Sequence, residues 1–93
     1  MTAFTKYQEA KAMYEAVPEE TREDLALSLE WAKKTLTEKE GAGHIFQIIP
    51  DMGDALCSCE FSKPEWAGSH VGSCMPYGSE AIVMAVCEYM VGL

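Results

Sequence analysis

The hydrophobic and polar positions of the first 17 residues repeat at three- and four-residue steps, which predicts a helix. Thr5 followed by Gln8 makes a capping box at its start. Pro18 ends it, because the residue before a proline is displaced from the helical region. The buried stripe is expected to comprise Tyr7, Ala10, Met13, Tyr14 and Val17.

The same periodicity continues to Gly41 and predicts a second helix. Two starts stay open: Pro18, followed by two glutamates, or Thr21 with Asp24 one turn later. Because only a short proline turn separates the two helices, we expect them to form an antiparallel pair. The apolar face of the second helix is expected to comprise Leu25, Leu29, Ala32 and Leu36, widened by Leu27 and Trp31.

After residue 43 the period changes to that of strands. Residues 44–50 are β-branched and aromatic, the segment around Gly53 is typical of a turn, and residues 55–61 alternate, so a hairpin is predicted. Residues 69–75 indicate a short third strand, weakened by Gly72. The inward positions of the second strand are expected to be Ala55, Cys57, Cys59 and Phe61.

Residues 80–92 fit either a helix or a strand. Ser79 as a cap and Gly92 as a stop favour the helix, whereas the β-branched residues favour the strand. We predict the helix. It would be apolar nearly all round, so it must be covered on two sides, by the sheet and by either the first two helices or a second chain in a homodimer.

The order of these elements predicts a single α+β domain over residues 1–93. It has two N-terminal antiparallel helices, a small antiparallel sheet of two or three strands, and a C-terminal helix packed on the sheet. An uncovered edge of such a sheet can accept a strand from a partner.

Charge narrows the class of partner. The chain carries 15 acidic and 7 basic residues, a net charge of −8, and residues 41–93 contain six acids against Lys63 alone. Such a chain repels nucleic-acid backbones and anionic lipid, so we expect neither as a partner. It suits a basic protein surface, although net negative charge can also serve solubility alone.

The N-terminus lacks the apolar core of an export signal, and no apolar run approaches the length of a membrane span. A cytoplasmic location is therefore predicted, where thiols stay reduced.

The cysteines allow a metal site. Cys57, Cys59, His70 and Cys74 could form a Cys3His zinc site. Cysteines two apart on one strand lie roughly 6–7 Å from each other, whereas sulfurs on one zinc ion lie within about 4 Å. We therefore favour core thiols and keep a small zinc-stabilised module as the alternative.

The sequence contains no recognisable set of catalytic residues. The only histidines are His44 and His70, and no nucleophile elbow, phosphate-binding glycine loop, zinc-protease motif or dinucleotide fingerprint is present. A non-enzyme without a cofactor is predicted.

The loop that follows the second strand is rich in aromatic side chains among glycines and prolines, and such loops often bind partners. Trp66 and Tyr77 either do this or cover one end of the core. The predicted partner-binding residues are Asp51, Asp54, Glu60, Glu65, Trp66, His70 and Tyr77.

As a whole-chain profile, this small acidic sequence resembles the proteins with which phages inhibit host defence, anti-CRISPR proteins among them. The resemblance covers all 93 residues and rests on no motif, so no site residue is carried over. It implies an inhibitor in the host cytoplasm that docks on a basic, nucleic-acid-binding protein and blocks it. A close nucleic-acid mimic is disfavoured, because Arg22 interrupts the acids of residues 19–24.

Overall fold

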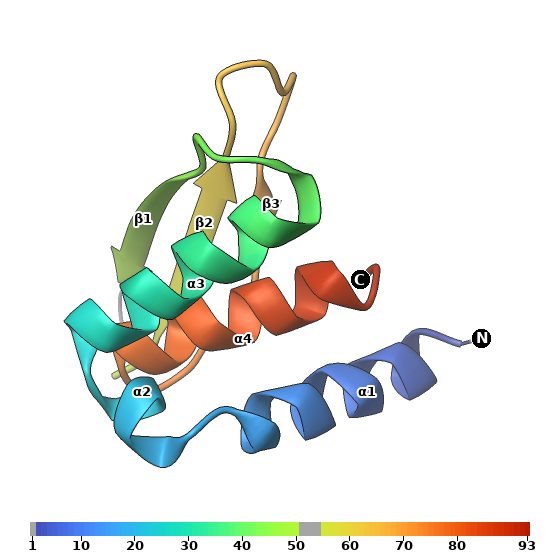
Figure 1. Cartoon of the computed structure of the whole chain (residues 1–93). Coiled ribbons are helices and arrows are strands. Elements are labelled where there is room, and N and C mark those ends of the chain that lie inside the picture. Colours follow the sequence, from blue (N-terminus) through green and yellow to red (C-terminus); the bar gives the residue numbers. More distant parts are fainter. Residues whose placement is uncertain (1, 51–54) are drawn as a thin grey trace.

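The computed structural model describes residues 2–50 and 55–93. The order of elements confirms an α+β fold with an antiparallel sheet and a C-terminal helix packed on it (Figure 1). The elements are α1 (Ala3–Ala16), α2 (Glu19–Glu23), α3 (Leu25–Glu40), β1 (Ile45–Pro50), β2 (Cys57–Ser62), β3 (His70–Val71) and α4 (Gly78–Met90).

Helix α4 lies at the centre of the molecule. One side of it packs against α3 and β2, and the other packs against α1. Helices α1 and α3 run in opposite directions, as predicted, but α4 lies between them, so they do not pack directly as a pair (Figure 1). The apolar surface of α4 explains this insertion, because it offers each helix more to bury than the other helix would.

Helix α1 starts earlier than predicted. Its N-cap is Thr2, whose hydroxyl accepts a hydrogen bond from the Thr5 amide at 3.2 Å, so the prediction of Thr5 as the cap was wrong. The helix ends at Ala16, before Pro18, as predicted. Its buried side chains are Ala10, Tyr14 and, at the C-cap, Val17.

The predicted second helix is two helices. The start after Pro18 exists as α2, but the alternative start at Thr21 was wrong, because Thr21 lies within α2. Helix α3 begins after Asp24, whose side chain accepts a hydrogen bond from the Leu27 amide at 2.9 Å. Leu25 and Leu27 are exposed, which corrects the predicted apolar face, and Ser28 is buried in their place. Burial of Ser28 is possible because its hydroxyl donates to the Leu25 carbonyl.

The sheet has the strand order β1-β2-β3 and is antiparallel throughout. Phe46 lies opposite Phe61, and Ile48 lies opposite Cys59, so these side chains share the face that α4 covers. The predicted alternation of β2 is confirmed for Cys59 and Phe61, which are fully buried, and Cys57 is partly buried. The prediction was wrong for Ala55, which lies before the strand and is exposed.

The C-terminal segment is a helix, as predicted. Ser79 lies inside its first turn and makes no capping bond; Tyr77 occupies the N-cap position, so the prediction of Ser79 as the cap was wrong. Gly92 follows the helix with φ of 87°, which suits glycine. Every side chain from Ala81 to Cys87 is buried within this chain, so α1, α3 and the sheet already cover the apolar sides of α4, without a second chain.

Within the described ranges, no helix has the length and apolar character needed to cross a membrane.

Gly72 gives the first testable prediction. A Cβ at this position would lie 2.6 Å from the Cα and Cβ of Ala85, so Gly72→Ala forces β3 away from α4. We expect a loss of about 1–3 kcal/mol in the free energy of unfolding, measured by urea denaturation. Gly68→Ala is the matched control, because nothing lies within 4 Å of its Cβ position. Equal effects of the two substitutions would contradict the packing of Gly72 on α4.

Candidate functional site

The loop between β2 and β3 packs its aromatic residues onto the end of α4. The Trp66 ring lies 5.7 Å from the Tyr89 ring and 6.2 Å from the Phe61 ring, between centroids. His70 lies 5.2 Å from Phe61 and 5.4 Å from Tyr89. The structure therefore brings Trp66 and His70 together, as the interpretation of this loop required, and both also cover the core.

His70 is held as a neutral ring. Burial lowers its pKa, although the nearby Glu88 carboxylate opposes the shift. Its Nε2 atom is buried and has no hydrogen-bond partner among the described residues. Glu88 is itself occupied by the chain that follows β3, because it accepts hydrogen bonds from the Ser73 amide at 2.7 Å and the Ser73 hydroxyl at 2.6 Å.

A shallow cleft of about 530 Å³ opens between this loop and the end of α4. Its walls combine two aromatic rings with small loop residues and the chain end. The cleft is lined by Trp66, Ala67, Gly68, Ser69, His70, Tyr89, Gly92 and Leu93.

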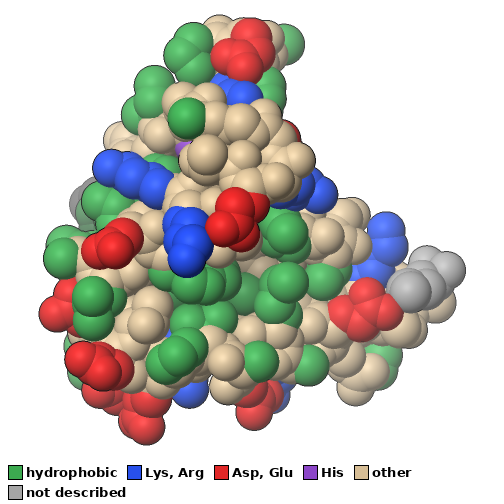
Figure 2. Space-filling view, in the orientation of Figure 1, with side chains coloured by type: hydrophobic (Ala, Val, Ile, Leu, Met, Phe, Trp, Pro, Cys, Tyr) green, Lys and Arg blue, Asp and Glu red, His purple; other side chains and the backbone are tan. Residues whose placement is uncertain are grey.

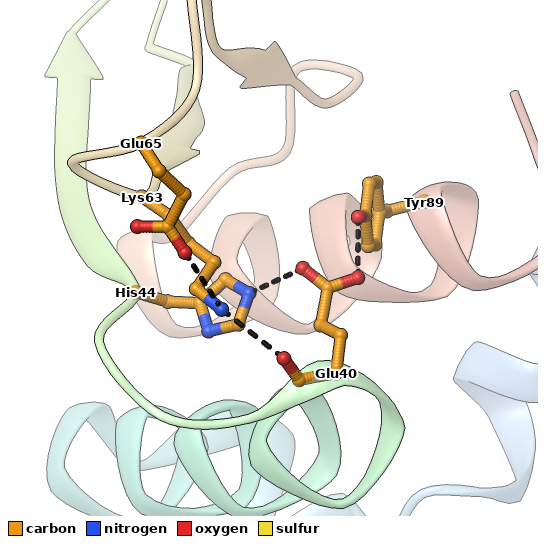
Figure 3. A network of polar contacts seen from close by, with 5 residues as sticks. All are labelled: Glu40, His44, Lys63, Glu65 and Tyr89. Atoms are coloured by element: carbon orange, nitrogen blue, oxygen red, sulfur yellow. Dashed lines mark hydrogen bonds and ion pairs between the residues drawn. The ribbon is translucent and has the colours of Figure 1, made fainter.

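Behind the cleft, Glu40 joins three elements (Figure 3). The Tyr89 hydroxyl donates to Glu40 Oε1 at 2.6 Å, and the His44 Nε2–H donates to Glu40 Oε2 at 2.7 Å. Lys63 donates to the Glu40 backbone carbonyl at 3.1 Å and pairs with Glu65 at 3.2 Å. The network ties the end of α3 and the start of β1 to α4 and the β2–β3 loop.

The charges of this network favour an ionised Glu40 beside a neutral Tyr89. Burial alone would raise the pKa of Glu40, but the hydrogen bonds from Tyr89 and His44 outweigh it and lower the pKa. Burial and the Glu40 carboxylate together raise the pKa of Tyr89 to about 12. A tyrosine with this pKa is a poor base or nucleophile, so we interpret the network as structural. We call the hydrogen bonds of Glu40 with His44, Lys63 and Tyr89 the Glu40 clasp.

The predicted acidic face is not a single surface. Glu65 is largely exposed but pairs with Lys63, and Glu60 accepts a hydrogen bond from the Ser69 hydroxyl at 2.9 Å. Tyr77 is 69% exposed, but it precedes α4, whereas Trp66 packs on the other end of that helix. A helix of this length separates them by about 20 Å. Asp51 and Asp54 lie outside the described residues.

A different acidic cluster surrounds Tyr77. Glu23, Tyr77 and Glu80 line a depression of about 320 Å³. One carboxylate oxygen of Glu80 is buried beneath the surface with no hydrogen bond among the described residues. Glu19, as a hydrogen-bond partner and as a like charge, raises the pKa of Glu23, and Glu80 acts in the same direction. We call Glu19, Glu23 and Glu80 the acidic cluster. Figure 2 shows acidic side chains along the lower left of the molecule, where α2 lies in Figure 1.

Arg22 does not neutralise the acidic cluster, although the sequence interpretation used it to interrupt these acids. Its guanidinium lies over the Tyr14 ring at 4.9 Å, and its Nε donates to the Val17 carbonyl at 2.9 Å. Its charge opposes the shift in the pKa of Glu23 without reversing it. The Arg22 side chain is therefore bound to the C-terminal end of α1.

The cysteines and His70 do not converge. Burial raises the pKa of the Cys59 thiol to about 11, and burial also raises the pKa of Cys57, whereas Cys74 is exposed. Within residues 2–50 and 55–93, no group of three or more histidine, cysteine or acidic side chains is placed to hold a metal ion. The alternative zinc site at Cys57, Cys59, His70 and Cys74 is thus not assembled here.

Comparison with known proteins does not place the chain in a family: no family model, curated protein or solved structure matches it. The site therefore rests on its geometry alone.

Sequence reasoning missed most of the residues that organise the two ends of α4. Glu88 carried a signal, since it is a lone acid within an otherwise apolar segment. The sequence gives no signal for Glu40, because an acidic residue at the end of a charged helix is common. The acidic cluster was undervalued, because the sequence does not show where Arg22 points.

The Glu40 clasp predicts a pH-dependent contribution to stability. Tyr89→Phe removes a hydrogen bond to a charged group and should cost about 1.5–3 kcal/mol at pH 7. Since the pKa of Glu40 is lowered in the folded state, this contribution is present above its ordinary value of 4.5 and is lost as the pH falls through the folded value. Urea denaturation from pH 3 to 8 measures it.

Tyr7→Phe, at an exposed position, is the control and should leave the profile unchanged. At alkaline pH the raised pKa of Tyr89 should make wild type lose stability between its ordinary value of 10.0 and about 12, and Tyr89→Phe should lack this loss. Parallel profiles for wild type and Tyr89→Phe across both ranges would show that the clasp contributes nothing.

Proposed function

We propose that this chain is a non-catalytic, acidic binding protein that docks on a basic surface of another protein. The observation that carries the proposal is the acidic cluster beside the exposed Tyr77. Like charges are held together there, the pKa of Glu23 is raised, and a buried oxygen of Glu80 lacks a described donor. Lysine or arginine side chains of a partner would relieve the repulsion between Glu19 and Glu23.

The position of a nearby cation supports the same proposal. Arg22, the cation within α2, is engaged with Tyr14 and Val17. Tyr77 adds a large, exposed aromatic side chain of the kind that anchors interfaces. An exposed aromatic ring within a negative surface is a better docking feature than net charge alone.

The basic surface of a cytoplasmic protein commonly serves to bind nucleic acid. Occupying such a surface would exclude the nucleic acid sterically and by competition for the same cations. This is the action expected of an inhibitor of the anti-CRISPR type, and it requires no catalytic group and no metal.

Charge reversal tests this function. We expect the immobilised chain to retain basic, nucleic-acid-binding proteins from a cell lysate, with retention that weakens as salt is raised. Glu19→Lys with Glu23→Lys should lower the affinity for a purified retained protein by roughly tenfold at low salt, as close charge pairs do. That protein's affinity for its nucleic acid, read by fluorescence anisotropy, should fall when wild type is added.

The matched control is Glu30→Lys with Glu38→Lys, which changes net charge equally at exposed positions of α3. Glu60→Lys with Glu65→Lys tests the acids near the β2–β3 loop, which already bond Ser69 and Lys63, and should have a smaller effect than the reversal of Glu19 and Glu23. The proposal fails if both control pairs weaken binding as much as the Glu19 and Glu23 pair does.

A further inference from the structure

Strand β1 forms a long outer edge of the sheet. It pairs with β2 on one side, and no described strand pairs with its other side. The opposite edge is β3, which has only two residues, and short edge strands are poor templates for pairing. Five of the six β1 residues retain an amide, and Ile45–Pro50 contains no charged side chain to discourage a partner.

The hydrogen bonds of β2 show which β1 amides point outward. Cys57 exchanges backbone hydrogen bonds with Met75, and the Cys59 carbonyl accepts from Gly72, so both residues use their backbone groups toward β3. Backbone groups of successive residues in an antiparallel strand point to opposite sides. Ser58 and Glu60 therefore bond β1.

The register then assigns the free groups. Ile49 lies opposite Ser58, and Gln47 lies opposite Glu60, so these two β1 residues are bonded to β2. The amides of Phe46 and Ile48 point to the open edge. Pro50 shares that side, where its missing amide costs the sheet nothing. The open edge thus offers two donors and three acceptors in a row.

Strand β1 lies beside the start of α4, the helix that carries Glu80 of the acidic cluster. A Cβ at Gly78, the neighbour of Tyr77, would lie 3.6 Å from the Ile48 side chain, so β1 passes directly by the start of α4. In Figure 1, β1 runs toward the end of the molecule that α2 occupies. A segment paired with β1 would run from a neutral apolar strip toward a negative surface.

We infer that β1 binds an extended, basic segment of the partner as an added fourth strand of the sheet. The inference rests on the proposed function and names the mode of docking. Main-chain hydrogen bonds to Phe46 and Ile48 supply the affinity. The acidic cluster selects lysine or arginine in the segment. A second copy of this chain fits less well, because each carries a net charge of −8.

A defined peptide tests the inference. The probe is a seven-residue capped peptide of alternating lysine and valine, and its control has the same sequence with alternate amides N-methylated. We expect the unmodified peptide to bind at least tenfold more tightly by calorimetry, because the control keeps the charge but loses half of its amide donors. Hydrogen exchange should become slower at the amides of Phe46 and Ile48 when the unmodified peptide binds.

Substitutions on the outer face of the sheet locate the added strand. Gln47→Lys puts a positive charge at the middle of β1 and should weaken peptide binding at least fivefold, whereas Gln47→Glu should not. Val71→Lys, at the opposite edge and 51% exposed, is the matched control and should leave binding unchanged. Circular dichroism confirms that each variant is folded.

Three results would overturn the added strand: equal affinity for the N-methylated peptide, equal effects of Gln47→Lys and Val71→Lys, or a concentration-dependent dimer that protects Phe46 and Ile48 without peptide. The proposed function fails separately. If wild type and Gln47→Lys retain basic proteins equally, the proposed function is supported and strand addition at β1 is overturned. If wild type binds the peptide at β1 but retains no basic protein, strand addition is supported and the proposed function is overturned.

Discussion

The burial of α4 is the constraint on which the rest of the structure depends. Seven consecutive residues, Ala81 to Cys87, are buried, so each side of the helix needs an apolar cover. Burial of apolar surface stabilises a fold by about 25 cal/mol per Å², so leaving either side of α4 uncovered would be costly. This constraint places α1 on one side of α4, and α3 with the sheet on the other. Among the described residues, no helix packs on the far face of the sheet and no strand pairs with the outer edge of β1.

The two ends of α4 differ in how their polar groups are satisfied. At the C-terminal end, the buried Glu88 and the partly buried Tyr89 have partners from distant segments, and these bonds hold the chain after β3 and the end of α3 in place. At the N-terminal end, Glu80 retains a buried oxygen without a described donor. The acids at the C-terminal end are thus bonded within the chain and serve the fold, whereas the acids at the N-terminal end lie beside like charges and are the ones we propose for a partner.

The contrast between the two ends of α4 places the proposed docking surface at the N-terminal end rather than at the aromatic β2–β3 loop. The aromatic residues of the β2–β3 loop are half-buried against Phe61 and Tyr89, so most of their surface already contributes to the fold. The acidic cluster and the β1 edge are not used in this way. Together they provide charge selection and a directional backbone template, two features that recognition of an extended basic segment requires.

The sequence by itself determined the class and the approximate place of most elements, because periodicity, Pro18, Gly41 and Gly92 act locally. It also predicted that the C-terminal helix must be covered on two sides. Only the tertiary structure decided that α4 separates α1 from α3, that Ser28 is buried in place of Leu25, and that Arg22 turns toward Tyr14. These outcomes depend on which surfaces compete for burial and on where long side chains find partners. Neither is encoded in the spacing of residues along the chain, so the acidic cluster became visible only in the fold.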